Sequence, residues 1–314
     1  MSLDALQGAL FVYATCSMFV YSLIVFAIKR QQHSFPVLRS SFFRLVCIHF
    51  IADLLFYLEF NIGMRGRKYG YLSWLLGDRV EEMTFLPRLF NASHYYIKCV
   101  VYMGQTIQAC NRLASAIYPL TYNKVFSGGR ILLISAVQFL LPLIAIVPIH
   151  ADPNYTFRFV PYKEEGTLRL ETSENVTDII AYTDMGVSAF CITASFLIYA
   201  ATIQIIHREF KGRLIKSSSK NVELRLLLTA LIIFVVFGLN VIIQIFTVLY
   251  NRIGMKEVMF INDVSYPMID VMYTCHPWTL LIFSSAIQSA LFRTVTGHSH
   301  SPLPPTASTE SQNV

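Results

Sequence analysis

Charged residues are scarce in this chain of 314 residues, in which Asp, Glu, Lys and Arg make up 14% and hydrophobic residues 54%. Soluble globular proteins contain about 25% charged residues, so a water-soluble globule is excluded. Glycine and proline are also few, with 14 and 12 residues, which rules out collagen-like and low-complexity chains. The net charge of +6 is too small and too scattered for a nucleic-acid binder. What remains is a polytopic membrane protein whose first partner is the lipid bilayer.

The polar segments contain no cysteine. All six cysteines fall inside apolar stretches, namely Cys16, Cys47, Cys99, Cys110, Cys191 and Cys275. The disulfide framework of a small secreted domain is therefore excluded. An internal repeat is also missing, which argues against the transporters built from inverted repeats.

Seven apolar runs are long enough to cross a bilayer, since a hydrocarbon core about 30 Å thick needs roughly 20 helical residues. They cover about 8–28, 42–62, 93–118, 131–149, 183–206, 226–250 and 266–290. We therefore expect an all-α membrane protein, in which residues 1–292 form a seven-transmembrane helix bundle. The first run has no basic residue before it and no clear small-residue cleavage site, which favours an uncleaved anchor. Residues 293–314, rich in Ser, Thr, Pro and His, are expected to form a disordered cytoplasmic tail.

The distribution of Lys and Arg predicts the orientation of the bundle. With the N-terminus outside and the C-terminus in the cytoplasm, the inner loops hold fourteen cations against three acids, as the positive-inside rule requires. The glycosylation sequons at Asn91, Asn154 and Asn175 all fall on the side predicted to be outside. Asn91 lies close to the membrane. The two longest loops are an outer one over 150–182 and an inner one over 207–225, and neither contains an inserted domain.

Ionisable side chains within the spans are functional candidates, because a charge inside a bilayer is costly. They are Asp53, Glu59, Lys98, Asp184, Asp270 and His276. Lys98 lies 14 residues before Arg112, hence about 21 Å toward the outside at ~1.5 Å per residue. It should face the bundle interior and meet Asp270, Asp184 or Glu59, and its height favours Asp270. A structural ion pair and a ligand contact both remain open for Lys98.

Three motifs in order resemble those of rhodopsin-like G-protein-coupled receptors. Residues 111–120, which begin Asn-Arg and end Pro-Leu, are similar to their Asp-Arg-Tyr signature, with the same spacing from Arg112 to Pro119. Ala52-Asp53 matches the Ala-Asp of the second span. His276-Pro277 takes the place of their Asn-Pro, ahead of a short amphipathic end at Phe292-Arg293.

Departures from that pattern point to a subfamily. The top of the third span and the 150–182 loop have no cysteine, so the usual extracellular disulfide cannot form, and the sixth span has no proline. Residues 40–45 (Ser-Ser-Phe-Phe-Arg-Leu) and the His-Pro-Trp run of the seventh span complete the pattern. Over about residues 5–295 the chain is similar to nematode serpentine chemoreceptors of the gamma-type superfamily.

The resemblance implies a receptor that couples to a heterotrimeric G protein. Arg112, with Asn111 and Pro119 beside it, would meet the G protein once the inner ends of the third and sixth spans separate. Because Asn111 replaces the usual Asp, the resting contact of Arg112 must come from elsewhere, and Glu223 is one option. The alternative role of Arg112 is that of an ordinary interfacial cation, as the positive-inside rule describes.

The resemblance also implies a ligand pocket and an intramembrane switch. A small-molecule ligand would bind in the outer half of the bundle, near Lys98, His94, Gln105, Asp184 and Asp270. The switch would comprise Asp53, His276 and Pro277. Asp53 resembles an acid that binds sodium in related receptors, but His276 stands where those receptors have Asn, so a bond between His276 and Asp53 is the simpler expectation. Pro277 removes one backbone bond and gives the seventh span a pliable point.

We therefore expect a chemosensory receptor in the plasma membrane, which includes the membrane of a sensory cilium. We expect no enzymatic activity, no cofactor and no metal. A receptor oligomer is compatible with the sequence. Two alternatives stay open. A seven-span ligand-gated channel subunit would have its N-terminus inside. An intramembrane metal hydrolase would use His49, Asp53 and His276, but the chain lacks a third strong His ligand, a His-Glu-x-x-His and a Gly-x-Gly-Asp motif.

Overall fold

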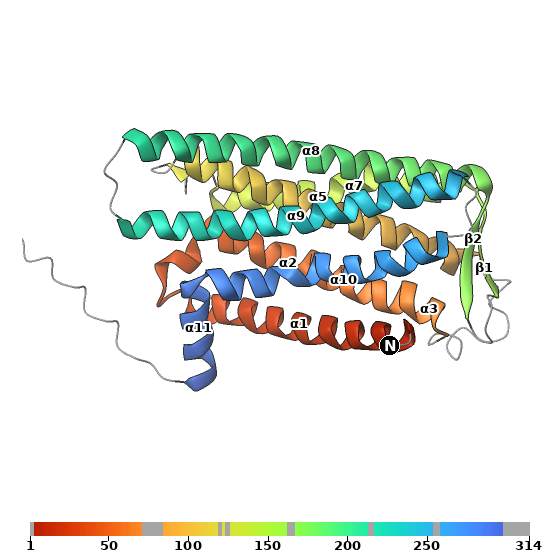
Figure 1. Ribbon diagram of the computed structural model, residues 1–314, viewed down its shortest axis with the longest axis horizontal. Helices are drawn as coiled ribbons and strands as arrows, with labels where there is room; N and C mark the ends of the chain where they lie inside the picture. Colours follow the sequence, from red (N-terminus) through yellow and green to blue (C-terminus); the bar gives the residue numbers. More distant parts are fainter. Residues whose placement is uncertain are drawn as a thin grey trace, which may run out of the picture.

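The computed structural model describes residues 3–70, 84–118, 121–122, 126–161, 167–212, 217–253 and 258–297. Within them, seven long helices run alongside one another in an elongated bundle (Figure 1). They are α1 (Leu3–Gln31), α2 (Ser41–Glu59), α5 (Phe85–Ile117), α7 (Gly128–Ala151), α8 (Glu174–Gly212), α9 (Ser217–Ile253) and α10 (Val258–Phe283). Each overlaps one of the seven predicted spans, so the predicted helical architecture is confirmed.

The most polar of these helices is shielded by the others. Among the described residues, α1, α2, α7, α8 and α9 contain segments that are long and apolar enough to cross a membrane. Helix α5 carries Arg88, Lys98 and Arg112, and it packs against α2, α7, α8 and α9. Since its neighbours separate it from lipid, the polar side chains of α5 face other protein groups.

Aromatic side chains fill the centre of the bundle. Tyr21 of α1, Phe56 of α2, Tyr102 of α5 and Tyr273 of α10 are fully buried and belong to one hydrophobic cluster. The rings of Phe56 and Tyr273 meet edge to face with centroids 5.7 Å apart. Large rings with defined packing geometry fix how the helices face one another.

The second span continues beyond its predicted end at residue 62. After α2 the chain forms a π-helix, η2 (Phe60–Arg65), and then the short helix α3 (Gly66–Lys68). The sequence placed Arg65 outside the membrane, but Arg65 is only 3% exposed. The helical extension therefore carries a cation into the outer part of the bundle.

A β-hairpin lies in the long outer loop, at the same end of the bundle as the N-terminus (Figure 1). Its strands, β1 (Phe157–Pro161) and β2 (Leu168–Thr172), pair antiparallel with Phe159 opposite Leu170. The hairpin is an addition to the predicted helical bundle, and it forms because Phe-Arg-Phe and Leu-Arg-Leu alternate apolar and polar residues with the period of a strand. Arg88 of α5 donates hydrogen bonds to the carbonyl oxygens of His150 and Tyr155, at 3.1 and 2.6 Å, and ties down the chain that leads into β1.

At the opposite end, the amphipathic helix α11 (Ser285–Thr296) runs across the bundle and packs against α1 (Figure 1). The Ser284 hydroxyl caps its start by accepting from the amide of Ile287, and Gly297, with φ of 68°, ends it in the left-handed conformation. The helix continues past residue 293, where the tail was expected to begin. Residues 298–314 lie outside the described residues.

The inner loop expected over 207–225 is largely helical. Helix α8 reaches Gly212 and α9 begins at Ser217. At ~1.5 Å per residue, the 39 residues of α8 extend well beyond a hydrocarbon core about 30 Å thick. Helix α8 is therefore too long to lie wholly within a hydrocarbon core of that thickness.

Candidate functional site

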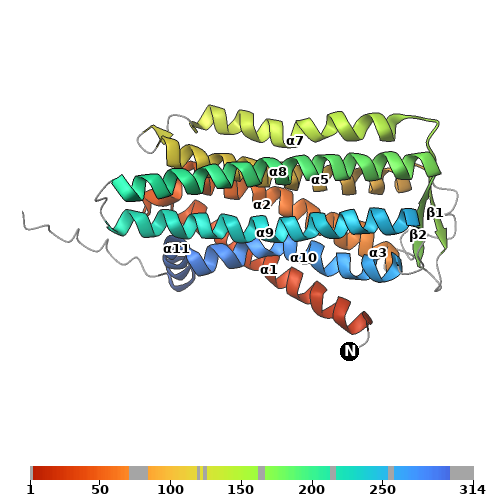
Figure 2. The same ribbon diagram turned by 45° about the horizontal axis from the view of Figure 1, so that its top comes forward.

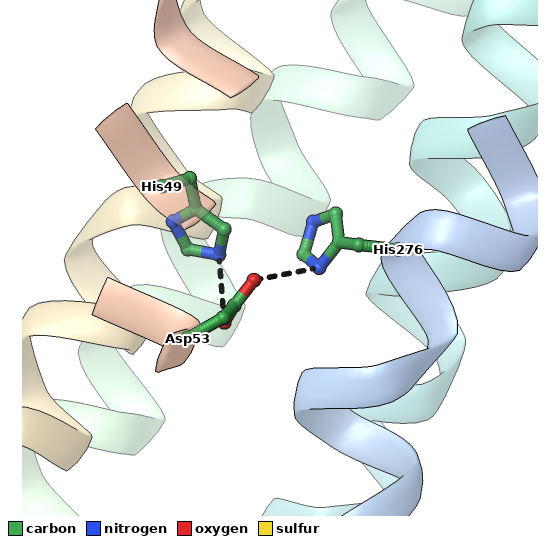
Figure 3. A group of neighbouring side chains, drawn as sticks. All are labelled: His49, Asp53 and His276. Atoms are coloured by element: carbon green, nitrogen blue, oxygen red, sulfur yellow. Dashed lines mark ion pairs between the residues drawn. The ribbon is translucent and has the colours of Figure 1, made fainter. Parts of the chain in front are cut away.

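Three ionisable side chains meet in the middle of the bundle, and we call them the central cluster. His49 and Asp53 lie one turn apart on α2, and His276 faces them from α10 (Figure 3). The Asp53 carboxylate lies between the two rings, 3.5 Å from His49 Nε2 and 3.4 Å from His276 Nδ1. His276 and Asp53, which were expected to bond, are neighbours, but no hydrogen bond joins them in the described part of the chain. All three side chains are shielded from solvent.

Helix α5 closes the third side of the central cluster. Nε2 of Gln105 lies 3.1 Å from Nε2 of His49 and 3.3 Å from Nε2 of His276. The preceding Gly104 leaves the space that the His49 ring occupies, because a Cβ on residue 104 would lie 2.2 Å from Nδ1 of His49. Gln105 was predicted to line the ligand pocket; it belongs instead to this deeper polar group.

Lys98 forms its ion pair with Asp184 of α8, with Nζ 2.5 Å from Oδ2. Asp184 was one of the three partners expected for Lys98, and the preference for Asp270 among them is wrong. The rise along each helix gave comparable heights for Lys98 and Asp270. However, α5 packs directly against α8, and so Lys98 meets Asp184. Both charged side chains are almost completely buried, so the pair is internal and does not extend toward the headgroups.

Asp270 pairs with Arg65 across the bundle. The Arg65 guanidinium contacts both carboxylate oxygens and also donates to Asn61 Oδ1 at 2.8 Å, while the Tyr273 hydroxyl donates to Asp270 at 2.5 Å. This bidentate geometry is the strongest form of ion pair between side chains. Arg65 was not predicted as a site residue. Two signals could have indicated it: it lies one helical turn after Asn61, and the buried Asp270 needs a cation as a partner.

A third pair joins His94 of α5 to Glu59 of α2, with 2.9 Å between Nδ1 and Oε2. Both residues were singled out from the sequence, but not as partners. The pair lies next to a cavity of about 340 Å³ that strand β2 covers. This hairpin cavity is lined by His94, Arg67, Phe90, Tyr95, Arg169 and Glu171, among others.

A second cavity, of about 560 Å³, lies between α1 and the end of α2. Helix α1 diverges from the rest of the bundle toward its N-terminus (Figure 2). The cavity is lined mostly by apolar groups, and Gln7, Asn61 and Arg65 are polar residues among its lining. Two of the outer ion pairs are thus adjacent to hollow spaces, through His94 and through Arg65.

At the end of α5 away from the hairpin, Asn111 and Arg112 are both buried. Asn111 exchanges hydrogen bonds with the Tyr122 hydroxyl, and the Arg112 guanidinium lies over the Phe42 ring, 4.0 Å from its centroid. Pro119 lies outside the described residues. Glu223 belongs to α9, but its side chain is outside the described part.

The three sequons differ in exposure. Asn154, before β1, and Asn175, at the start of α8, are exposed, both at the end of the bundle that holds the hairpin. Asn91 lies within α5, half buried, with Oδ1 2.8 Å from Nε2 of His150. Asn154 and Asn175 are therefore the accessible candidates for glycosylation.

Comparison with known families gives a match over residues 10–297 to the model of the serpentine-type seven-transmembrane G-protein-coupled chemoreceptors called Srv. The chain belongs to this family. The prediction of a serpentine chemoreceptor is confirmed, and this Srv chemoreceptor is a multi-pass membrane protein of a non-enzymatic class. No curated protein shows a significant match to it.

Within the Srv chemoreceptor, the polar groups fall at three levels along the bundle. The hairpin cavity and the outer ion pairs are near one end, the central cluster is in the middle, and Asn111 and Arg112 are near the other end. Pro277 directly follows His276 in α10, which also contains Pro267. Helices α5 and α10 each contribute residues to more than one of these levels.

Proposed function

We propose that this chain is a plasma-membrane chemosensory receptor that binds an external small molecule and activates a heterotrimeric G protein. The match to the Srv family along nearly the whole chain carries the proposal. In this proposal the N-terminus is outside, and a ligand shifts a resting-to-active equilibrium by binding one state more tightly. The basic inner face meets the G protein.

The ligand site we propose is the hairpin cavity. It lies at the predicted outer end, it is lined by His94 from the predicted set, and Arg67 and Arg169 add hydrogen-bond donors. A cavity of about 340 Å³ suits a small organic molecule, since ligand pockets have volumes of roughly 300–1,000 Å³. The donors favour a ligand that carries acceptor groups. Lys98 and Asp184 lie below the site and would respond to it rather than line it.

The two arginines of the hairpin provide a matched test of the ligand site. Arg169 lines the cavity, whereas Arg158 is not among its lining residues; both are exposed and both contact Glu171. Cells that express the receptor and report second messengers would first be screened with a panel of small metabolites. Arg169→Ala should then lower the potency of an active compound about tenfold, the loss of roughly one hydrogen bond to a charged group, while Arg158→Ala should not. Equal potency in both variants would move the site away from the hairpin cavity.

Coupling is tested at the inner end. Arg112→Ala should retain surface expression and ligand binding but abolish the second-messenger signal, and Glu223→Ala should raise basal signalling. Arg44, an exposed cation at the start of α2, is the matched control, and Arg44→Ala should signal normally. Full signalling by Arg112→Ala would return Arg112 to the role of an interfacial cation.

Topology separates the receptor from the channel alternative. Asn154→Gln together with Asn175→Gln should remove a glycosidase-sensitive shift in gel mobility, because both sequons are exposed at the predicted outer end. Glycans on a sequon introduced into the 207–225 segment would place that segment outside and contradict the receptor orientation.

A further inference from the structure

The Asp53 carboxylate is buried without a compensating positive charge among the described residues. Neither of its oxygens accepts a hydrogen bond there, and its ion-pair neighbours are the imidazoles of His49 and His276. Nδ1 of each imidazole also has no hydrogen-bond partner in the described part. An isolated buried carboxylate is expensive, and buried charges are normally paired or bound to a metal. The central cluster is therefore an environment that favours a cation.

The spacing of the donor atoms suits a small metal ion. One donor atom from each of His49, Asp53 and His276 can be chosen so that all three lie within 4.8 Å of one another. The distances from His49 Nε2 to Asp53 Oδ1, 3.5 Å, and from His276 Nδ1 to Asp53 Oδ2, 3.4 Å, are close to the separation of about 3.3 Å between donors in a tetrahedral zinc site with bonds of 2.0–2.1 Å. A modest approach of the two rings would complete the geometry.

The chemistry of the donors selects the type of metal. Imidazole nitrogen suits Zn²⁺ and its first-row neighbours, whereas Na⁺, Mg²⁺ and Ca²⁺ prefer oxygen donors. Two imidazoles and one carboxylate form a familiar set of protein ligands for Zn²⁺. Gln105 lies 3.3 Å from Nε2 of His276, the nitrogen left over when Nδ1 of that ring binds the metal, and with its amide turned to present the carbonyl oxygen it accepts the Nε2–H and orients the His276 ring. Outer groups of this kind fix the ring that binds the metal.

We infer that the central cluster binds one divalent transition-metal ion of the zinc type, with His49, Asp53 and His276 as ligands and Gln105 as a positioning residue. The bound ion joins α2 to α10 at the residue immediately before Pro277. Since a proline leaves a helix pliable, a metal bridge at this point restrains the movement of α10 against α2. The metal thus acts as a regulator of the receptor, separate from the external ligand of the proposed function.

The test uses the full-length receptor, purified in detergent, treated with a chelator and then titrated with Zn²⁺ or Co²⁺. The wild type should bind one equivalent per chain and show a higher thermal unfolding midpoint, because an ion that binds only the folded state stabilises it. Bound Co²⁺ should show the visible absorption of a site with nitrogen ligands.

Three variants test the assignment of the ligands. Asp53→Asn and His276→Ala should weaken Zn²⁺ binding by at least about 100-fold, and Gln105→Leu by about 10–100-fold, the range for loss of an outer-shell partner. Asp53→Asn is nearly isosteric and removes the buried charge, so it should fold in chelator and give a binding measurement even if His276→Ala does not. His33→Ala changes an exposed histidine outside the central cluster and should bind Zn²⁺ normally.

Several results would overturn the inference. They are a wild type that binds no stoichiometric metal, an Asp53→Asn variant with wild-type affinity, and loss of Zn²⁺ binding in His33→Ala. Na⁺ that raises the midpoint as Zn²⁺ does and competes with it would also overturn the choice of metal. None of these measurements depends on ligand response or G-protein coupling, so they stand or fall separately from the proposed receptor function.

Discussion

In the half of the bundle nearer the hairpin, Asp184 faces Lys98 and Asp270 faces Arg65, so each of these two buried acids has a cation of its own. In the middle, Asp53 faces two imidazoles and no Lys or Arg within the described residues. Both groups of residues are buried, but only the two acid–cation pairs are balanced in charge. Removing an acid should therefore have opposite consequences in the two regions, because it creates an unpaired charge in one and removes an unpaired charge in the other.

The largest expected effect is at Asp270. Asp270→Ala leaves the Arg65 guanidinium buried without its bidentate partner, and breaking such a pair costs about 3–5 kcal/mol. We expect loss of surface expression, and a much lower midpoint in thermal unfolding of any purified protein. The matched double variant Arg65→Met with Asp270→Leu removes both charges and should recover most of the stability. A double variant no better than Asp270→Ala would contradict the assignment of the pair.

The second effect separates the two candidate partners of Lys98. Lys98→Asp and Asp184→Lys should each destabilise the receptor, and the double exchange should recover about 1–3 kcal/mol as a coupling energy. Combining Lys98→Asp with Asp270→Lys should give no recovery, because Asp270 belongs to Arg65. Thermal unfolding in detergent measures all four variants, and recovery in the combination with Asp270→Lys would show that Asp270 is the partner of Lys98.

The third effect is steric and concerns the wall of the central cluster. Gly104→Ala places a Cβ 2.2 Å from Nδ1 of His49, and overpacking of this kind costs about 1–3 kcal/mol. Gly186→Ala on α8 is the control, since nothing lies within 4 Å of its added Cβ and alanine favours a helix. We expect a lower unfolding midpoint for the first variant and an unchanged or higher one for the second. Similar midpoints would mean that the His49 ring can move away freely.

The smallest effect has the opposite sign. In chelator, Asp53→Asn should leave the stability unchanged or raise it by up to about 1 kcal/mol, because an amide replaces an uncompensated carboxylate and can donate to an imidazole. The same thermal measurements apply, with Asp184→Asn as a matched control that leaves Lys98 unpaired and lowers the midpoint. Destabilisation of both variants to the same degree would erase the contrast between the two regions.

Much of the fold follows from the sequence, because seven apolar runs leave few alternatives once each must span a bilayer. The contact of His276 with Asp53 also follows from the matched motifs. The partner of Lys98 does not, since residue counts along α5 and α10 give heights but not which faces meet. The burial of Arg65 depends on a π-helix that apolar periodicity does not reveal. The hairpin, by contrast, has a readable signal in the alternation over 157–161 and 168–172.

The π-helix at Phe60–Arg65 also affects how such receptors can diverge. A π-helical turn contains one more residue than an α-helical turn of the same kind, and one residue corresponds to a rotation of about 100°. Insertion or deletion of one residue here rotates every following side chain about the helix axis, including that of Arg65. His49 and Asp53, which precede this segment, keep their positions. Variation in length at this one segment can therefore change which side chains line the cavities beside the end of α2, while the central cluster stays in place.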